Sequence, residues 1–404
     1  MDKIILPADA AFIIDELRKN GFEGHIVGGC VRDSIMGIKP HDYDITTSAK
    51  PEEVKNIFPH TFDTGIQHGT VTVVINKENY EVTTFRIDGE YEDCRHPKEV
   101  NFTRDIHEDL LRRDFTMNAI AYNPYDGYTD IFGGIEDIGR KIIRGVGDPD
   151  ERFKEDALRI LRAVRFSAQL GFEIEPETKK AMENNVGLIK NISSERIREE
   201  LTKLLISKHT EKLPLLWQTG LLENISQRLA DSISGREDII QKEIAQSEKT
   251  VPVIFAILTQ FIKPDEIKKE LSFYKFDNKT LNQIICLNSL VNQKAQSDEI
   301  SVRRLANKTG IENAFLFYSL KKAQGDNEAE SAENVLNMVI KRGDCLFVKD
   351  LALSGKDLIC IGLKPGKEMG LVLNSLLDMV INDPKLNTRE ILIKTVKENF
   401  IDNI

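Results

Sequence analysis

Two short motifs near the N-terminus carry most of the structural information in this chain: Gly28-Gly29-Cys30-Val31-Arg32-Asp33 and, shortly after it, Asp42-Tyr43-Asp44. The first motif follows His25-Ile26-Val27, which predicts a short strand, and it opens a helix that we expect to end near Gly37. Two glycines between a strand and a helix allow backbone N–H groups to approach a phosphate. The motif therefore indicates a phosphate-binding turn, with an ordinary glycine turn as the alternative.

The second motif places two carboxylates, Asp42 and Asp44, on a strand that we predict around Tyr43 to Ile45. Side chains two positions apart on a strand point to the same face of the sheet. Neighbouring carboxylates repel unless a cation lies between them, and hard oxygen ligands suit Mg²⁺. A solvated turn is the alternative interpretation of Asp-x-Asp. The glycine turn upstream favours the Mg²⁺ site, because phosphate binding and metal binding serve one reaction.

Flanking patterns extend the fold around these motifs. Apolar residues at helical spacing predict a helix over Ile4 to Lys19, and a second helix is expected over Glu52 to Phe58. Alternating β-branched residues predict a hairpin from Val71–Ile75 and Tyr80–Phe85, joined by a turn at Asn76–Asn79. The N-terminal segment is therefore expected to mix helices with strands.

Beyond Gly133-Gly134 the pattern is helical and no strand is expected. Polar stretches at Asn292–Glu299 and Gly325–Glu333 predict loops. The chain is therefore expected to be an α+β protein, with an N-terminal mixed β-sheet head followed by an all-helical neck, body and tail. The expected domains are the head at 1–137, the neck at 138–204, the body at 205–291 and the tail at 292–404.

Composition narrows the class of protein. A chain of 404 residues with 41% hydrophobic and 30% charged residues is expected to be soluble and to contain several domains. No apolar run reaches the roughly 18 residues of a membrane helix, and the N-terminus lacks a secretory pattern. Five cysteines without a CxxC pair favour reduced thiols in the cytoplasm over disulfides or a cysteine zinc site. The net charge of −10 requires any nucleic-acid surface to be local.

Several motifs in order resemble the class II tRNA nucleotidyltransferases (CCA-adding enzymes) and bacterial poly(A) polymerases of the polymerase-β superfamily. The glycine and Asp-x-Asp motifs match the opening of that family. The further matching segments are Arg112-Arg113-Asp114-Phe115-Thr116-Met117-Asn118-Ala119, Glu155-Asp156-Ala157-Leu158-Arg159 with its continuation to Phe172, Ile192-Ser193-Ser194-Glu195-Arg196-Ile197, Ser354-Gly355-Lys356-Asp357-Leu358 and Gly362 to Gly366. The resemblance covers most of the chain.

The resemblance assigns roles to individual residues. It implies that Asp42 and Asp44 are catalytic metal ligands and that Glu81, on the predicted hairpin, is a third catalytic carboxylate; an edge-strand glutamate facing water is the alternative. It also implies a set of nucleotide-binding residues: Gly28, Gly29, Arg32, Arg112, Asp114, Asn118, Asp156, Arg159, Arg162 and Arg165.

Two of these motifs also have a direct chemical interpretation. The Arg112-Arg113 guanidiniums can bind phosphate, and Asp114 can accept hydrogen bonds from ribose hydroxyls; a salt-bridged helix terminus is the alternative. Asp156 and Arg159 lie three positions apart, so we expect them to share a helix face, where an acceptor beside a donor can bind the edge of a base. An intrahelical ion pair is the alternative.

The function implied by the resemblance is template-independent addition and repair of the 3′-terminal CCA of tRNA from CTP and ATP, with Mg²⁺ as cofactor. The tail is expected to bind tRNA, and no membrane partner is expected. The segment Asp88–Pro97 resembles the flexible loop of enzymes that add the terminal A, with Arg95-His96-Pro97 in place of the family's Arg-Arg-Pro. An A-adding enzyme, a poly(A) polymerase and a non-catalytic RNA-binding protein with a degenerate head remain alternatives, and both monomer and homodimer stay open.

Overall fold

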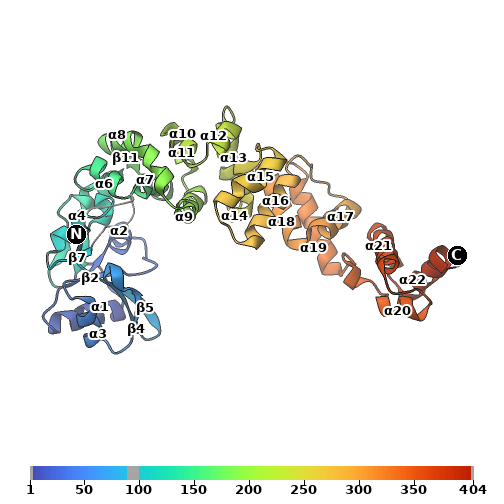
Figure 1. Ribbon diagram of the computed structural model, residues 1–404, viewed down its shortest axis with the longest axis horizontal. Helices are drawn as coiled ribbons and strands as arrows, with labels where there is room; N and C mark the ends of the chain where they lie inside the picture. The colour runs from blue at the N-terminus through green and yellow to red at the C-terminus, as the bar shows by residue number, and fades with distance from the viewer. Residues whose placement is uncertain (1–2, 89–99, 402–404) are drawn as a thin grey trace. The chain divides into compact units, whose positions relative to one another are not determined.

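The computed structural model describes residues 3–88 and 100–401, and the chain divides into two compact units, Met1–Asp231 and Ser232–Ile404 (Figure 1). The boundary falls inside helix α12 (Gln227–Ile233). The expected four-domain division at 137, 204 and 291 stays a prediction. The expected flexible loop, including Arg95-His96-Pro97, lies outside the described residues apart from Asp88 at its start.

The N-terminal unit is built on a seven-stranded mixed sheet in the order β3-β4-β5-β2-β1-β8-β9. Only β2 and β5 run parallel to each other, and every other neighbouring pair in this sheet is antiparallel. The strands are β1 (Gly24–Val27), β2 (Ile45–Thr47), β3 (Thr61–Gly65), β4 (Thr70–Ile75), β5 (Glu78–Thr84), β8 (Ala121–Asn123) and β9 (Gly127–Thr129). A separate antiparallel pair joins β6 (Arg86–Asp88) to β7 (Val100–Phe102).

Helices cover both faces of this sheet. Helices α1 (Ala8–Lys19) and α3 (Pro51–Ile57) contact each other (Figure 1). Helix α1 packs so closely on β1 that a Cβ at Gly24 would lie 2.9 Å from Leu17 Cδ1. On the opposite face, Val27 of β1 packs with Leu110 of α4 (Ile106–Leu111). The helix expected from Ile4 begins only at Ala8, because a residue that precedes proline, here Pro7, is disfavoured in the helical conformation.

The predicted hairpin is confirmed. Asn76 and Lys77 form its turn with φ of 51° and 71°, the left-handed backbone of a two-residue turn that matches the twist of paired strands. The register runs from Ile75 opposite Glu78 to Thr70 opposite Thr83, and it pairs Glu81 with Thr72. The turn thereby determines which residues of β5 share a face.

The segment after Gly134 is mainly helical, as expected. Its helices in the first unit include α5 (Gly134–Arg140), α6 (Pro149–Glu155), α7 (Leu158–Leu170), α8 (Pro176–Asn185) and α9 (Ser194–Leu205). The expectation of no strand is wrong, because β10 (Ile142–Ile143) pairs in parallel with β11 (Glu173–Ile174). Two residues per strand are too few to produce an alternating pattern in the sequence.

The second unit is helical throughout its described residues. Its main helices are α13 (Glu237–Gln246), α14 (Val251–Thr259), α15 (Pro264–Phe273), α16 (Asn278–Ser289), α17 (Glu299–Thr309), α18 (Ile311–Ala323), α19 (Ala329–Arg342), α20 (Gly355–Cys360), α21 (Lys367–Asn382) and α22 (Arg389–Val396). The loop expected over Asn292–Glu299 is present, and the one expected over Gly325–Glu333 is shorter because α19 begins at Ala329.

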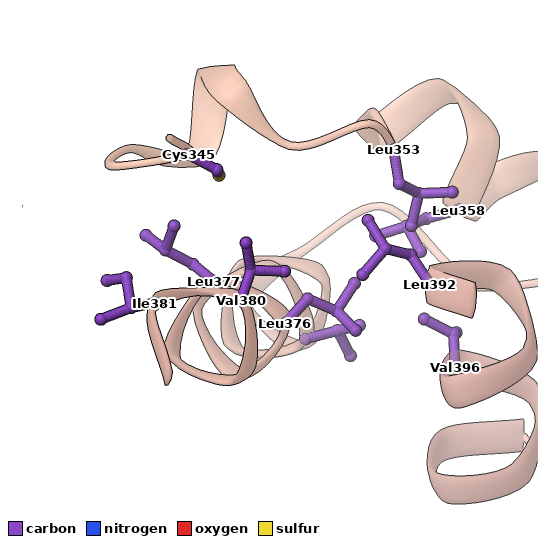
Figure 2. Packing of buried hydrophobic residues seen from close by; sticks show 10 residues of the cluster. Cys345, Leu353, Leu358, Leu376, Leu377, Val380, Ile381, Leu392 and Val396 are labelled. Carbon is purple, nitrogen blue, oxygen red and sulfur yellow. The ribbon is translucent and has the colours of Figure 1, made fainter. Parts of the chain in front are cut away.

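The last three helices share an apolar core. Leu358 of α20, Leu376 and Val380 of α21, and Leu392 and Val396 of α22 are buried and belong to one cluster (Figure 2). In the described part of the chain, no helix combines the length and apolarity that crossing a bilayer requires. The structure therefore confirms an α+β chain with a mixed N-terminal sheet and a long helical remainder.

A glycine contact places α5 against the turn that carries Asn118. A Cβ added at Gly134 would lie 2.1 Å from the Thr116 carbonyl oxygen, whereas one at Gly139 in the same helix would meet nothing within 4 Å. We expect Gly134→Ala to destabilise the first unit by about 2 kcal/mol or more, because close-packed atoms must move apart. Gly139→Ala should be neutral or stabilise by up to about 1 kcal/mol.

The measurement is urea unfolding followed by the fluorescence of Trp217, the single tryptophan, which lies in the first unit. Equal midpoints for the two variants would contradict the packing argument.

Candidate active site

Asp42 and Asp44 lie in the extended segment directly before β2, which begins at Ile45 rather than at the predicted Tyr43. The Asp44 carbonyl accepts a hydrogen bond from Val27 N at 3.0 Å, so the pairing with β1 continues past the end of the strand. The parallel register places Ile45 opposite Val82, which puts Asp44 beside Glu81 on the adjoining strand. Alternation along the extended backbone orients Asp42 and Asp44 to the face that carries Glu81.

Packing and the proximity of these three carboxylates shift the pKa of Asp44. Its side chain is open to solvent on one side, but the protein packed around the rest of it, together with the negative charges of Asp42 and Glu81, raises the pKa of Asp44 to about 6. Arg113 is close enough to act in the opposite direction. The three predicted catalytic carboxylates therefore form one electrostatic cluster with Arg113 at its border.

This cluster fits a divalent cation bound together with substrate. Within residues 3–88 and 100–401, no three side chains of His, Cys, Asp or Glu form a ready-made metal site. Mg²⁺ commonly binds through one or two carboxylates, with water and substrate phosphates as its other ligands. Asp42 and Asp44 supply oxygen donors of that kind, and their surplus negative charge favours a bound cation.

The glycine turn borders the same cluster. Gly28 has φ of 79°, a conformation that glycine adopts without strain, and α2 (Gly29–Ile35) begins directly after it. A Cβ at Gly28 would lie 3.3 Å from Arg113 Nη1, so the missing side chain leaves room for the guanidinium beside the turn. The predicted strand, turn and helix are confirmed here.

Arg113 was expected to bind phosphate together with Arg112, but only Arg112 was placed in the predicted set of nucleotide-binding residues. Its neighbour Arg112, which was selected, binds Asp109 through Nε at 3.0 Å and Nη2 at 2.6 Å. Arg113 donates to Asp109 at 3.1 Å, and its buried Nε has no hydrogen-bond partner among the described residues. The Arg-Arg-Asp motif was the available signal, but it does not say which arginine lies next to Asp44.

Asp114 is the centre of a buried hydrogen-bond network. It accepts from Phe115 N at 2.8 Å, from Asn118 Nδ2 at 3.0 Å, and from Arg162 Nε and Nη2 at 3.0 and 2.6 Å. Asn118 in turn accepts from Arg32 Nη1 at 2.7 Å. Four donors fill the lone-pair positions of the Asp114 carboxylate, so a ribose hydroxyl can bind it only by replacing one of them.

Charge pairing decides the protonation of Asp114. Burial alone would raise the pKa of this carboxyl, but the Arg162 charge and the Asn118 amide hold it at about 2. Asp114 and Asp44 therefore differ in kind, since the first has a compensated charge and the second does not.

Arg159, Arg162 and Arg165, three of the predicted nucleotide-binding residues, lie together on α7. Arg165 donates to Glu200 of α9 at 2.5 Å, and the guanidinium carbon of Arg165 lies 3.9 Å from the centroid of the Phe166 ring. Arg32 and Arg162 approach the same ring at 5.3 Å each. Arg159 and Arg165 are buried, so the arginines are held in place by partners inside the protein.

The prediction that Asp156 and Arg159 share a helix face is wrong. Asp156 ends α6 with extended backbone angles, φ −142° and ψ 99°, whereas Arg159 lies in the first turn of α7. Neither do they form the alternative ion pair: Asp156 binds Arg196 at 2.7 Å, and Arg159 binds Glu155 at 2.7 Å. At this break the Asp156 carboxylate accepts a hydrogen bond from Leu158 N, the first residue of α7, at 3.1 Å.

Residues 24–144 match the poly A polymerase head domain, 171–232 the RNA- and SrmB-binding region of polymerase A, and 245–396 tRNA nucleotidyltransferase domain 2. The chain is 37% identical over 395 residues to the CCA-adding enzyme of Lactobacillus helveticus, covering 96% of both chains. The chain belongs to the CCA-adding enzyme family. The corresponding protein of Ligilactobacillus salivarius is 36% identical over 401 residues, covering 96% of this chain and 95% of that one.

Solved structures agree with this assignment. The Bacillus stearothermophilus CCA-adding enzyme in complex with CTP superposes with a TM-score of 0.85 at 33% identity, covering 99% of both chains. The Thermotoga maritima CCA-adding enzyme complexed with tRNA shares the fold, with a TM-score of 0.67 at 21% identity over 98% of this chain and 96% of that one. The family resemblance inferred from the ordered motifs is confirmed.

The buried network around Asp114 generates a test. Asp114→Asn should destabilise the first unit by about 2 kcal/mol or more at pH 7, because Arg162 loses its shorter ion pair in a partly buried place and keeps only Glu200 at 3.7 Å. The pKa of Asp114 is lowered from 3.8, so its stabilising effect is present above that value and is lost as the pH falls through about 2. The difference between wild type and variant should therefore shrink between pH 4 and about pH 2.

Urea unfolding followed by Trp217 fluorescence at several pH values measures this difference. The control is Glu151→Gln, which removes a surface pair with Lys154 and should cost less than about 0.5 kcal/mol. A pH-independent difference for Asp114→Asn would show that its charge does not stabilise the fold.

Proposed function

We propose that this protein adds and repairs the 3′-terminal CCA of tRNA, taking CTP and ATP as substrates, releasing pyrophosphate and working without a nucleic-acid template in the cytoplasm. The observation that carries the proposal is the parallel β2–β5 register, which sets Asp44 beside Glu81 next to the Gly28 turn and Arg113. A full-length relative at 33% identity with CTP bound supports the nucleotide. The Thermotoga maritima relative is complexed with tRNA, which suggests tRNA as the partner here as well.

Asp42 and Asp44 would hold Mg²⁺, with Glu81 as the neighbouring third carboxylate. When bound, the metal would lower the pKa of the tRNA 3′-hydroxyl and balance the charge of the departing pyrophosphate. All other contributions come from positioning by the chain's own residues, which is the main source of catalysis in nucleotidyl transfer.

The triphosphate is assigned to the Gly28-Gly29 turn and to Arg113. The turn presents backbone without side chains, and the Arg113 guanidinium lies beside both this turn and Asp44. Arg32 already donates hydrogen bonds to Asp33 and to Asn118. We therefore assign it to holding the residues around the glycine turn in place. Asp114 and Asn118 are assigned to the ribose, through exchange of one of the four hydrogen bonds that Asp114 accepts.

Base selection is assigned to Asp156 and Arg159. Cytosine and adenine each present an exocyclic amino group, whereas uracil and guanine present a carbonyl oxygen at the corresponding position. A carboxylate accepts from the amino group and repels the carbonyl, and the neighbouring guanidinium donates to ring acceptors. Arg159 is fixed by Glu155 and by the carbonyl oxygens of Arg152 and Arg112, at 2.7, 3.0 and 2.7 Å.

A tRNA lacking CCA, incubated with each nucleoside triphosphate separately and then with CTP and ATP together, tests the function directly. Addition of two C residues followed by one A is the expected product on a sequencing gel. Addition of A alone to a tRNA ending in CC, or growth of a long A tract, would replace the proposal by an A-adding enzyme or a poly(A) polymerase.

Asp42→Asn and Asp44→Asn should each abolish addition of both C and A, because the paired carboxylates serve the chemistry rather than the docking of tRNA. Binding of tRNA, measured by filter retention, should stay within about twofold of wild type, a difference of about 0.4 kcal/mol. The control is Asp63→Asn, an exposed aspartate on β3 that pairs with Lys55. More than a few per cent of wild-type activity in both site variants would refute the metal assignment.

A further inference from the structure

We infer that Arg303 is a positioning residue for tRNA binding, which acts by fixing the last three helices of the chain on helix α17. These helices, α20 to α22, are called the terminal bundle below. The inference rests on the proposed function, since it takes tRNA as the partner that the terminal bundle helps to bind.

The terminal bundle has an apolar core of its own. The buried and partly buried members of the cluster around Leu376 and Leu392 lie between Cys345 and Phe400 (Figure 2). Among the described residues, no member of this cluster belongs to α17, although α17 contacts α21. Apolar packing therefore holds the bundle together, and polar contacts attach it to α17.

The central polar contact is made by one buried arginine of α17. Arg303, which is 2% exposed, donates from Nε to the Ile381 carbonyl oxygen at 2.7 Å, in the last turn of α21. Its Nη1 donates to Glu299 Oε2 at 2.8 Å and to Asp344 Oδ2 at 2.9 Å. Asp344 follows α19, in the connection that leads into the terminal bundle, and its side chain is also buried. One guanidinium thus joins α17 both to this connection and to the end of α21.

This joint fixes an orientation as well as a contact. A planar guanidinium binds three acceptors only in one arrangement, and its buried charge requires those acceptors to stay in place. The Ile381 carbonyl is among the last four of α21, which have no partner within the helix. A cavity of about 580 Å³, lined in part by Asp344 and Lys385, lies beside the joint, so side-chain packing does not hold the bundle from this side.

The terminal bundle carries local positive charge in an acidic chain. Residues 354–367 contain three lysines and one aspartate, a net charge of +2, whereas the whole chain has a net charge of −10. The lysines, all exposed, are Lys356, Lys364 and Lys367. The aspartate, Asp357, pairs with Arg389 at 2.8 Å. Exposed lysines bind the phosphates of nucleic acids, and a bundle held at one angle adds such contacts at a lower entropic cost than a loose one.

The experiment measures initial rates of C addition to a tRNA lacking CCA, with tRNA and CTP varied in turn. Arg303→Gln should raise KM for tRNA about tenfold, because the bundle no longer meets the RNA at a fixed angle. Its kcat and its KM for CTP should stay within about twofold of wild type, since the carboxylate cluster lies in the other unit. Arg303→Lys keeps the charge without the planar fork and should fall between.

Two further variants separate the buried joint from direct contact with RNA. Asp344→Asn should also raise KM for tRNA, although removal of a negative charge would by itself favour RNA binding. The matched control is Arg304→Gln, because Arg304 joins the same two helices at the surface, where its pair with Asp378 at 3.3 Å is solvated. Arg304→Gln should have the KM of wild type.

Two measurements accompany the kinetics. Hydrogen exchange of the α21 and α22 amides, followed by mass spectrometry, should be the same in Arg303→Gln and wild type, because the bundle keeps its own core. The Kd for tRNA, measured by filter retention, should rise in parallel with KM and does not require catalysis.

An unchanged KM and Kd for tRNA in Arg303→Gln would overturn the inference. An equal rise in Arg304→Gln would do the same by assigning the effect to exposed charge, and faster exchange throughout α21 and α22 would show that Arg303 only maintains the fold of the bundle. A wild-type protein that adds no C to tRNA would refute the proposed function, and filter retention would still decide the role of Arg303.

Discussion

The buried chain of hydrogen bonds from Arg162 through Asp114 and Asn118 to Arg32 is the interaction on which the site depends. It joins helix α7 to the turn after α4 and to the helix that follows the glycine turn. Burying any one of these charged groups without its partner would cost several kcal/mol, so each group keeps the others in place. Through this chain, the helix that begins beside Asp156 is positioned against the sheet that bears the Asp44 cluster.

Two carboxylates in this unit, the buried Asp114 and the solvent-open Asp44, have opposite environments. Asp114 has every acceptor position filled and its charge compensated, so it behaves as part of the scaffold. Asp44 is surrounded by Asp42 and Glu81, and its charge is left without full compensation. A cation and an anionic substrate bind most favourably here, where the carboxylate charge of Asp44 is uncompensated and the Arg113 guanidinium lies nearby. The site is thus the place where the protein leaves carboxylate charge without full compensation.

Local features of this structure could be predicted from the sequence, whereas features made by distant partners could not. Gly28 and the hairpin turn need a particular backbone, so their residue types predict them. Helical periodicity does not show the break at Asp156, because the apolar spacing continues through it. In the structure, the break is marked by the hydrogen bonds that the Asp156 carboxylate accepts from Leu158 N and from Arg196. Arg112 and Arg113 are identical residues side by side that both bind Asp109, and the sequence does not say which of them lies near Asp44.

The parallel pairing of β2 with β5 also restricts how this gene can change length. Residues inserted into the short connection between α3 and β3 leave the pairing of Ile45 with Val82 untouched, so that connection can change length. A single codon lost between Glu78 and Glu81 is different, because it turns every following side chain of β5 to the other face and carries Glu81 away from Asp44. Insertions and deletions should therefore be tolerated in the connection before β3 and excluded, one residue at a time, from β5.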